Sequence, residues 1–207
     1  MIKATDYWNQ RAPGFDDMIE RVYKQTHADT INKIKAYLNQ QDRVLDFACG
    51  TGTISIGIAD QVAEVHAIDI SGEMVRLTQE KLEKLGIKNV EVLQKELFDE
   101  NLRPDSFDVV VAANVLCYLE HWDQEMERIR SLLKSGGLFL SATDCLREEI
   151  TGISIKKFVK VHTGKMPYEK FFTMDGLEKK IAGEDFAVLE RENLHNAPPN
   201  LFIAARK

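Results

Sequence analysis

The sequence lacks the features that mark several classes of protein. It has three cysteines, Cys49, Cys117 and Cys145, and their odd number and wide spacing exclude a disulfide framework and a paired-cysteine metal motif. The five histidines show no metal-ligand spacing, so no metal site is expected. The first residues lack the apolar core of a signal peptide, and the longest apolar stretch, 109–119, is too short to span a bilayer. We therefore expect a soluble protein in the reducing cytoplasm.

An excess of basic residues is absent as well. The chain has 27 Lys and Arg against 33 Asp and Glu, a net charge of −6, which argues against a dedicated nucleic-acid binder. Its 207 residues are 44% hydrophobic and 29% charged, as is ordinary for one globular domain. Neither a nucleic acid nor a membrane is an expected partner. A monomer or a homodimer is expected.

Short apolar runs alternate with helical patterns along most of the chain. The runs predict five strands, at 43–48, 64–69, 90–94, 107–112 and 138–143. Amphipathic patterns predict helices between them, at 53–60, 71–85 and 123–137. This alternation predicts an α/β fold with a doubly wound, mostly parallel sheet and helices on both faces.

The two ends of the chain depart from this alternation. Phe15, Met18, Ile19, Val22 and Tyr23 fall on one helical stripe, and Ile31, Ile34 and Leu38 mark a second short helix. Near the end, 186–189 and 201–205 both resemble strands, and the residues between them include two prolines but no helical pattern. A parallel crossover normally needs a helix, so the last pair of strands is predicted to be antiparallel.

Ligands of open α/β sheets bind at the C-terminal ends of the strands, and three features of the sequence fall there. The turn 46–52 contains two glycines that allow close approach of a ligand to the backbone; a tight turn without a ligand is the alternative. Asp69 lies nineteen residues after Gly50, where it suits a ribose, although it could instead stabilise the next helix. Glu96 and Leu97 follow the third strand, where they suit either an adenine edge or a solvated loop.

The details of the turn favour one nucleoside cofactor over another. The dinucleotide fingerprint G-x-G-x-x-G needs a third glycine, whereas the chain has Ser55 at that position after Gly50 and Gly52. Asp46 places a carboxylate beneath the turn, which disfavours a pyrophosphate but suits a ligand with an ammonium and a sulfonium. The sequence therefore points to S-adenosylmethionine rather than NAD.

At these residues the chain resembles class I S-adenosylmethionine-dependent methyltransferases, of the small-molecule group that includes quinone-biosynthesis-type enzymes. The segments 44–52 and 68–71 are similar to the first two motifs of the family, 90–97 to the third, and 106–111 and 132–137 to the fourth- and fifth-strand signatures. The resemblance implies a Rossmann-like sheet of seven strands in the order 3-2-1-4-5-7-6, with strand 7 antiparallel. It also implies S-adenosylmethionine as cofactor and S-adenosylhomocysteine as product.

The family also implies roles for individual residues. Asp46 would hold the methionine ammonium, Asp69 the ribose and Glu96 the adenine amino group, although Glu96 replaces the usual aspartate. The other residues expected at the cofactor are Ala48, Gly50, Gly52, Ile70, Leu97 and Asn114. The residues expected around the acceptor are Tyr7, Trp8, Phe15, Tyr118 and Trp122. His121 is a candidate base, with a surface or N-capping role as its alternative.

We expect a single methyltransferase domain over 1–207, with four segments that have different roles. Residues 1–40 would form an N-terminal helical lid, 41–143 the cofactor-binding half, 144–173 a roof over the acceptor, and 174–207 a C-terminal helix and hairpin. From Arg147 to Lys180 the chain has eight basic and five acidic residues, which suits either an anionic acceptor or a solvated surface. Methyl transfer to a small molecule is the function expected. The alternatives are an NAD-dependent oxidoreductase, a protein or RNA methyltransferase, and a non-catalytic module that binds the cofactor.

Overall fold

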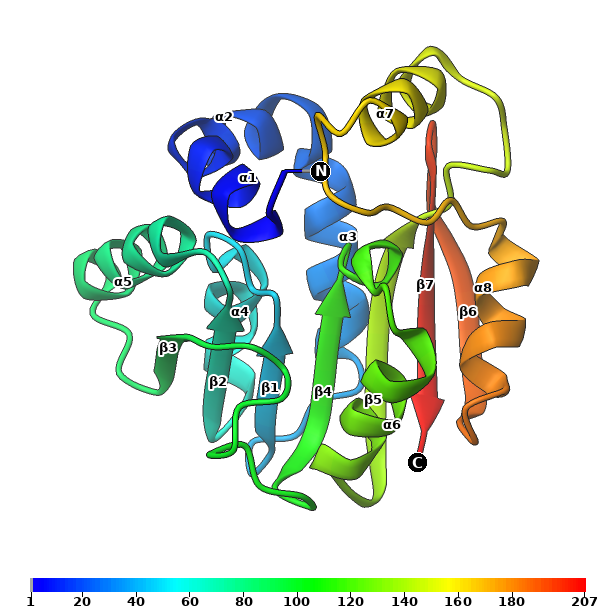
Figure 1. Ribbon diagram of the computed structural model, residues 1–207. Coiled ribbons are helices and arrows are strands. Elements are labelled where there is room, and N and C mark those ends of the chain that lie inside the picture. Colours follow the sequence, from blue (N-terminus) through cyan, green and yellow to red (C-terminus); the bar gives the residue numbers. More distant parts are fainter. Residues whose placement is uncertain (1) are drawn as a thin grey trace.

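Seven strands form one sheet in the order β3-β2-β1-β4-β5-β7-β6 (Figure 1), in a computed structural model that describes residues 2–207. The strands are β1 (Arg43–Phe47), β2 (Glu64–Asp69), β3 (Val90–Gln94), β4 (Phe107–Ala113), β5 (Leu133–Asp144), β6 (Ala187–Asn196) and β7 (Pro199–Arg206). The pairs among β1 to β5 are parallel, and β7 is antiparallel to both β5 and β6. The fold class, the strand order and the antiparallel last strand predicted above are confirmed.

The helices connect these strands and extend the chain at its N-terminus. They are α1 (Ala4–Arg11), α2 (Phe15–Met18), α3 (Lys24–Lys35), α4 (Thr53–Ile58), α5 (Gly72–Leu85), α6 (Trp122–Leu132), α7 (Gly152–His162) and α8 (Met174–Ala182). Ser71 caps α5, because its side chain accepts a hydrogen bond from the Met74 amide. Within residues 2–207, no helix combines the length and the apolar character needed to cross a bilayer.

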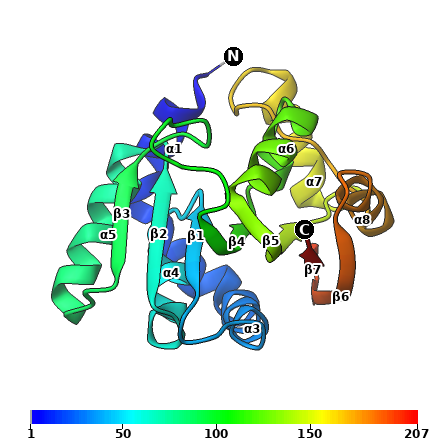
Figure 2. The same ribbon diagram turned by 90° about the horizontal axis from the view of Figure 1, so that it is seen from below.

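Helices cover both faces of the sheet (Figure 2). On one face, β4 side chains such as Val110 pack with Met126 of α6 and Leu177 of α8. On the other face, Val109 and Val111 pack in a second core with side chains from α3, α4 and α5. Because successive strand residues point to opposite faces, a strand covered on both sides must be apolar throughout, as β4 is.

The N-terminal segment and α7 lie above the ends of the strands, at the top of Figure 1. The stripe predicted from Phe15 to Tyr23 lies in a helical stretch, but the stretch is irregular: α2 ends at Met18, a π-helical turn covers Ile19–Tyr23, and Val22 is exposed. The other four residues of the stripe are buried or half-buried, so the stripe faces inward at every position except Val22. The next helix, α3, ends at Lys35, so Leu38 of the predicted stripe lies beyond it.

The fifth strand begins earlier than predicted. The helix expected to close at Gly136 and Gly137 ends at Leu132, and β5 starts at the next residue. The pairing of β5 with β4 shifts between Phe107 and Val109, so the two glycines lie in an irregular stretch of the strand. Gly136 has φ +75°, which a glycine adopts without strain.

Candidate active site

A cavity of about 800 Å³ opens at the C-terminal ends of β1, β2 and β4. Its floor is the turn after β1, with Asp46 and Gly50. Its walls include the ends of β2 and β4, and its cover comes from the N-terminal segment and the region around α7. Residues distant in the sequence therefore enclose one space, at the position that the strand order predicts for a ligand.

The backbone of the turn after β1 is bent into a conformation that favours glycine. Gly50 and Gly52 have φ +56° and +77°, and Ala48 has φ +58°. A Cβ atom on Gly52 would lie 2.5 Å from the Thr78 Cγ2 atom, so α5 packs directly against the turn. The turn thus holds its backbone close to the cavity and close to α5.

Asp46 lies beneath this turn and is fully buried. Its Oδ2 atom accepts a hydrogen bond of 2.5 Å from the Ser55 hydroxyl. Burial raises the pKa of Asp46 to about 6, the Ser55 hydrogen bonds oppose this rise, and the nearby charge of Asp69 adds to it. A cation placed in the cavity beside Asp46 would favour its ionised form.

Asp69 ends β2 and fixes the backbone around it. Its Oδ2 accepts from the Gly50 amide at 2.9 Å, and its Oδ1 accepts from the Ser71 amide at 2.8 Å. Burial raises the pKa of Asp69, and the backbone hydrogen bonds oppose that rise. Each carboxylate oxygen keeps a further lone pair, so Asp69 can still accept from two hydroxyl groups in the cavity.

Of the remaining residues expected at the cofactor, the structure places all but one in the cavity lining. The cavity lining includes Ala48, Ile70, Glu96, Leu97 and Asn114 in addition to the residues above. Gly52 lies outside the lining and acts on the shape of the turn. Asn114 has φ +54°, and its Oδ1 accepts hydrogen bonds from the Asp144 amide and the Asn200 side chain.

Four of the residues expected around the acceptor lie together in the lining. Trp8 is at their centre, with ring centroids 5.1 Å from Tyr7, 5.3 Å from Tyr118 and 6.3 Å from Phe15. The fifth, Trp122, lies outside the lining: it is buried and donates its indole N–H to Glu184.

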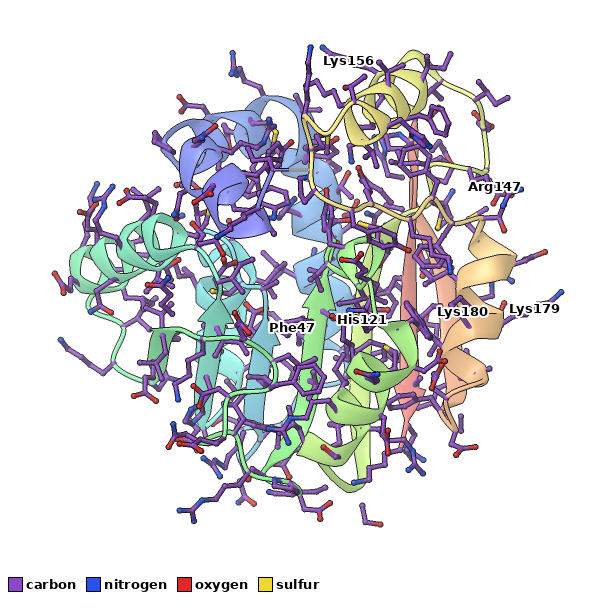
Figure 3. The ribbon with its side chains drawn as sticks, viewed as in Figure 1. Phe47, His121, Arg147, Lys156, Lys179 and Lys180 are labelled. Carbon is purple, nitrogen blue, oxygen red and sulfur yellow. The ribbon has the colours of Figure 1, made fainter. Side chains whose placement is uncertain are left out.

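His121 also lies outside the cavity lining, at the start of α6 (Figure 3). Its backbone amide donates to the Glu125 carboxylate at 2.9 Å, and the side chain is on the exposed surface. His121 therefore lies on the surface at the N-cap position of α6, where its side chain makes no capping hydrogen bond. The geometry gives His121 no contact with the cavity.

Several polar residues that line the cavity were not selected in the sequence analysis, and four of them lie in the N-terminal helices, at the end of β5 and on α7. They are Tyr23, His27, Asp144 and Lys157. Asp144 carried a recognisable signal, because it directly follows a predicted strand, much as Asp69 ends one. Lys157 lay on a helix whose basic residues were considered only as a group. For Tyr23 and His27 the sequence offered no signal beyond the helical pattern.

A family model described as a methyltransferase domain matches residues 38–185. This chain belongs to the methyltransferase-domain family. The match includes the turn after β1, Asp69 and the whole of 144–173, whereas the cavity residues of the N-terminal segment, such as Trp8, lie outside it. The class I, S-adenosylmethionine-dependent assignment is confirmed; the quinone-biosynthesis-like subgroup stays a prediction.

Individual relatives agree with the family. A sterol 4-C-methyltransferase of Caenorhabditis elegans is 25% identical over 188 residues, which cover 88% of this chain and 55% of that protein. An Aquifex aeolicus SAM-dependent methyltransferase structure has a TM-score of 0.72 at 20% identity and covers 100% of this chain and 99% of its own. The DhpI–SAH complex has a TM-score of 0.76 at 20% identity and covers 98% and 94%. This chain spans about half the length of the curated relatives it matches.

The residues present fit S-adenosylmethionine, the cofactor of this family. Asp46 offers a buried carboxylate toward an ammonium, and Asp69 offers two oxygens toward ribose hydroxyls. Ile70 and Leu97 line the part of the cavity beside Asp69, where an apolar adenine face suits them. When bound, the cofactor supplies an electrophilic methyl group on a sulfonium.

The raised pKa of Asp46 predicts a pH dependence for cofactor binding. Because burial raises the folded-state pKa above the ordinary value, protonated Asp46 contributes stability to the free protein that is fully present below that ordinary value and is lost as pH rises through about 6. Binding of the ligand ammonium has the opposite dependence, since it needs the ionised carboxylate. We expect affinity for S-adenosylhomocysteine, measured by calorimetry, to be about tenfold lower at pH 5 than at pH 7.

The variant Asp46→Asn provides the control for this titration. It keeps the shape of the side chain and removes the ionisable group, so its weaker binding should change much less between the same two pH values. Asp69 also has a raised pKa, and any residual slope in Asp46→Asn would report that second carboxylate. Wild-type affinity that is constant, or that increases on acidification, would contradict the role given to Asp46.

Proposed function

We propose that this chain transfers the methyl group of S-adenosylmethionine to a small molecule held in the same cavity. The observation that supports a small acceptor is the enclosure: about 800 Å³ of continuous space lies between the cofactor-binding turn and a cover formed by the N-terminal segment and α7. Small-molecule sites commonly have volumes of roughly 300–1,000 Å³. Asp46 and Asp69 occupy one end, and Trp8 and Tyr118 line another part of the space.

The protein contributes orientation and exclusion of water to such a reaction. Methyl transfer from a sulfonium needs the nucleophile in line with the bond that breaks, and orientation can supply on the order of 7–11 kcal/mol of the barrier. The aromatic side chains around Trp8 form a rigid apolar wall. Hydrogen bonds hold the lid above the turn: Ser71 donates to Asn9, and Thr51 donates to Asp16.

The charges in and around the cavity argue against the rival functions. A protein or RNA substrate would be favoured by an open basic rim, but Arg147, Lys156 and Lys179 are exposed and lie on the outer side of the roof and of α8 (Figure 3). The lining itself has six acidic and four basic residues. An NAD-dependent reaction is disfavoured because a pyrophosphate would lie near the buried Asp46.

The proposal is tested by following the methyl group. The purified chain is incubated with methyl-labelled S-adenosylmethionine and separate small-molecule, protein and RNA fractions of a cell extract. Label is expected in the small-molecule fraction and is expected to disappear with Asp69→Ala. Label in protein or RNA alone would overturn the small-molecule acceptor. Binding of NADH without binding of S-adenosylhomocysteine would overturn the cofactor as well.

A further inference from the structure

Asp144 is a further carboxylate of the cavity lining, on a different strand from Asp46 and Asp69. Asp144 is the last residue of β5 and lines the cavity. Its Oδ1 accepts from the Asn200 side chain at 2.8 Å, and its backbone amide donates to Asn114 at 3.1 Å. Within residues 2–207, its Oδ2 makes no hydrogen bond and no basic side chain forms a salt bridge with it. These contacts fix the side chain and leave one oxygen available to a ligand.

The position of Asp144 is electrostatically unfavourable without a ligand. The residue is mostly buried, and burial raises its pKa, while the Asn200 hydrogen bond and the charges of Lys157 and His195 oppose the rise. A buried carboxylate without a cation costs free energy that a partner in the cavity can recover. Asp46 and Asp69 have the ammonium and the ribose of the cofactor as such partners. Asp144 lies on a different strand and has neither.

The aromatic wall lies close to Asp144. The charge of Asp144 contributes to the raised pKa of Tyr23, and in a smaller part to that of Tyr118, beside the larger effect of burial. Both side chains line the cavity, and Tyr118 contacts the Trp8 ring at 5.3 Å between centroids. Aromatic faces attract organic cations, and a carboxylate beside several such faces is a recurrent way to bind an ammonium.

Lys157 is the obvious partner for an acceptor of the opposite charge, but it is already neutralised. Its Nζ forms a salt bridge of 2.7 Å with Glu169, whose side chain is completely buried. Tyr118 also donates to the same Glu169 oxygen at 3.4 Å. Since Lys157 is paired with Glu169, it does not neutralise Asp144. The other cation beside the aromatic residues, Arg11, lies 5.3 Å from the Tyr7 ring centroid and, within residues 2–207, forms no salt bridge with Asp144. The cavity lining has more acidic than basic residues, which also favours a positively charged ligand.

We propose that Asp144 binds the acceptor, and that the acceptor carries an ammonium group held between the Asp144 carboxylate and the aromatic wall of Tyr7, Trp8, Tyr23 and Tyr118. The inference rests on the proposed function and narrows its substrate class to amines. Asp144 is the residue that selects this class, in the same way that Asp46 and Asp69 select the cofactor.

The test measures charge preference in the protein saturated with S-adenosylhomocysteine. The probes are primary aryl- and alkylamines, each matched with an alcohol and a carboxylate of the same skeleton, such as 2-phenylethylamine, 2-phenylethanol and 3-phenylpropanoate. Binding is followed by calorimetry and by saturation-transfer NMR. At least one amine is expected to bind about tenfold or more tightly than both of its matched partners, the scale of a charge-assisted hydrogen bond.

Two variants connect that preference to one side chain. Asp144→Asn should remove the preference for the amine, while Asp123→Asn makes the same change of net charge at an exposed residue of α6 outside the lining and should leave it intact. Unchanged affinity for S-adenosylhomocysteine in both variants shows that the fold is preserved. The wild-type order of affinities is a test in itself should Asp144→Asn not fold.

The outcomes separate this inference from the proposed function. Preferential binding of the carboxylates, absence of binding by every amine, or an amine preference that survives in Asp144→Asn would each overturn the role of Asp144. All three leave the binding of S-adenosylhomocysteine unaffected. Loss of that binding in the wild-type protein would instead overturn the proposed function.

Discussion

Replacing Asp69 with alanine is expected to weaken binding of S-adenosylhomocysteine by about 1–3 kcal/mol, which corresponds to roughly 5- to 150-fold. The variant removes both oxygens that face the ribose hydroxyls. It also leaves the Gly50 and Ser71 amides, 2.9 and 2.8 Å from the carboxylate, without their acceptor. The free energy of unfolding should therefore decrease as well, by about 1–3 kcal/mol. Calorimetry measures the first effect and urea denaturation the second.

A modified ligand separates the loss of the ribose contact from damage to the turn. If Asp69 binds the ribose, an S-adenosylhomocysteine analogue without the 2′- and 3′-hydroxyls binds weakly to the wild type, and Asp69→Ala weakens it little further. Glu80→Ala, at an exposed carboxylate on α5, should leave both ligands unaffected. Additive losses from the variant and the analogue would place the ribose elsewhere.

The part of the cavity that the sequence could predict depends on local order. The turn after β1 and the end of β2 are adjacent because parallel strands end at the same edge, so Asp46 and Asp69 could be brought together from their strand positions alone. The antiparallel end of the sheet followed from the short connection before β7. These inferences need only the periodicity of apolar residues and the length of the connecting segments, and both can be read directly from the sequence.

What the sequence could not provide depends on contacts between distant segments. Lys157 of α7 is neutralised by Glu169, twelve positions away in an irregular stretch, and no periodic pattern relates the two. The same limit applies to Asn200, whose contact with Asp144 joins β7 to the end of β5. Trp122 illustrates the opposite error. Its place after β4 suggested a cavity position, but its side chain packs against Phe172 in the core.

These contacts place the three carboxylates at different distances along the sheet edge. Asp46 and Asp69 belong to the neighbouring strands β1 and β2, whereas Asp144 ends β5, on the other side of β4. All three carboxylates line the same cavity, which is the arrangement that the proposed division between cofactor and acceptor requires.

The largest expected effect on the shape of the site comes from Gly52→Ala. Gly52 has φ +77°, where a side chain costs about 1–2 kcal/mol. Its new Cβ would also lie 2.5 Å from Thr78 Cγ2, and relieving such an overlap typically costs a further 1–3 kcal/mol, an order-of-magnitude figure. The turn must move away from α5, so affinity for S-adenosylhomocysteine should fall together with the free energy of unfolding.

Gly86→Ala separates the two causes. Gly86 has φ +70° at the end of α5, but a Cβ there has no atom within 4 Å, so the variant should lose only the backbone cost of about 1–2 kcal/mol and bind the ligand normally. Adding Thr78→Ser to Gly52→Ala removes the overlapping methyl group and should restore part of both losses. Equal destabilisation by the two glycine variants, or normal ligand affinity in Gly52→Ala, would show that the turn does not depend on its contact with α5.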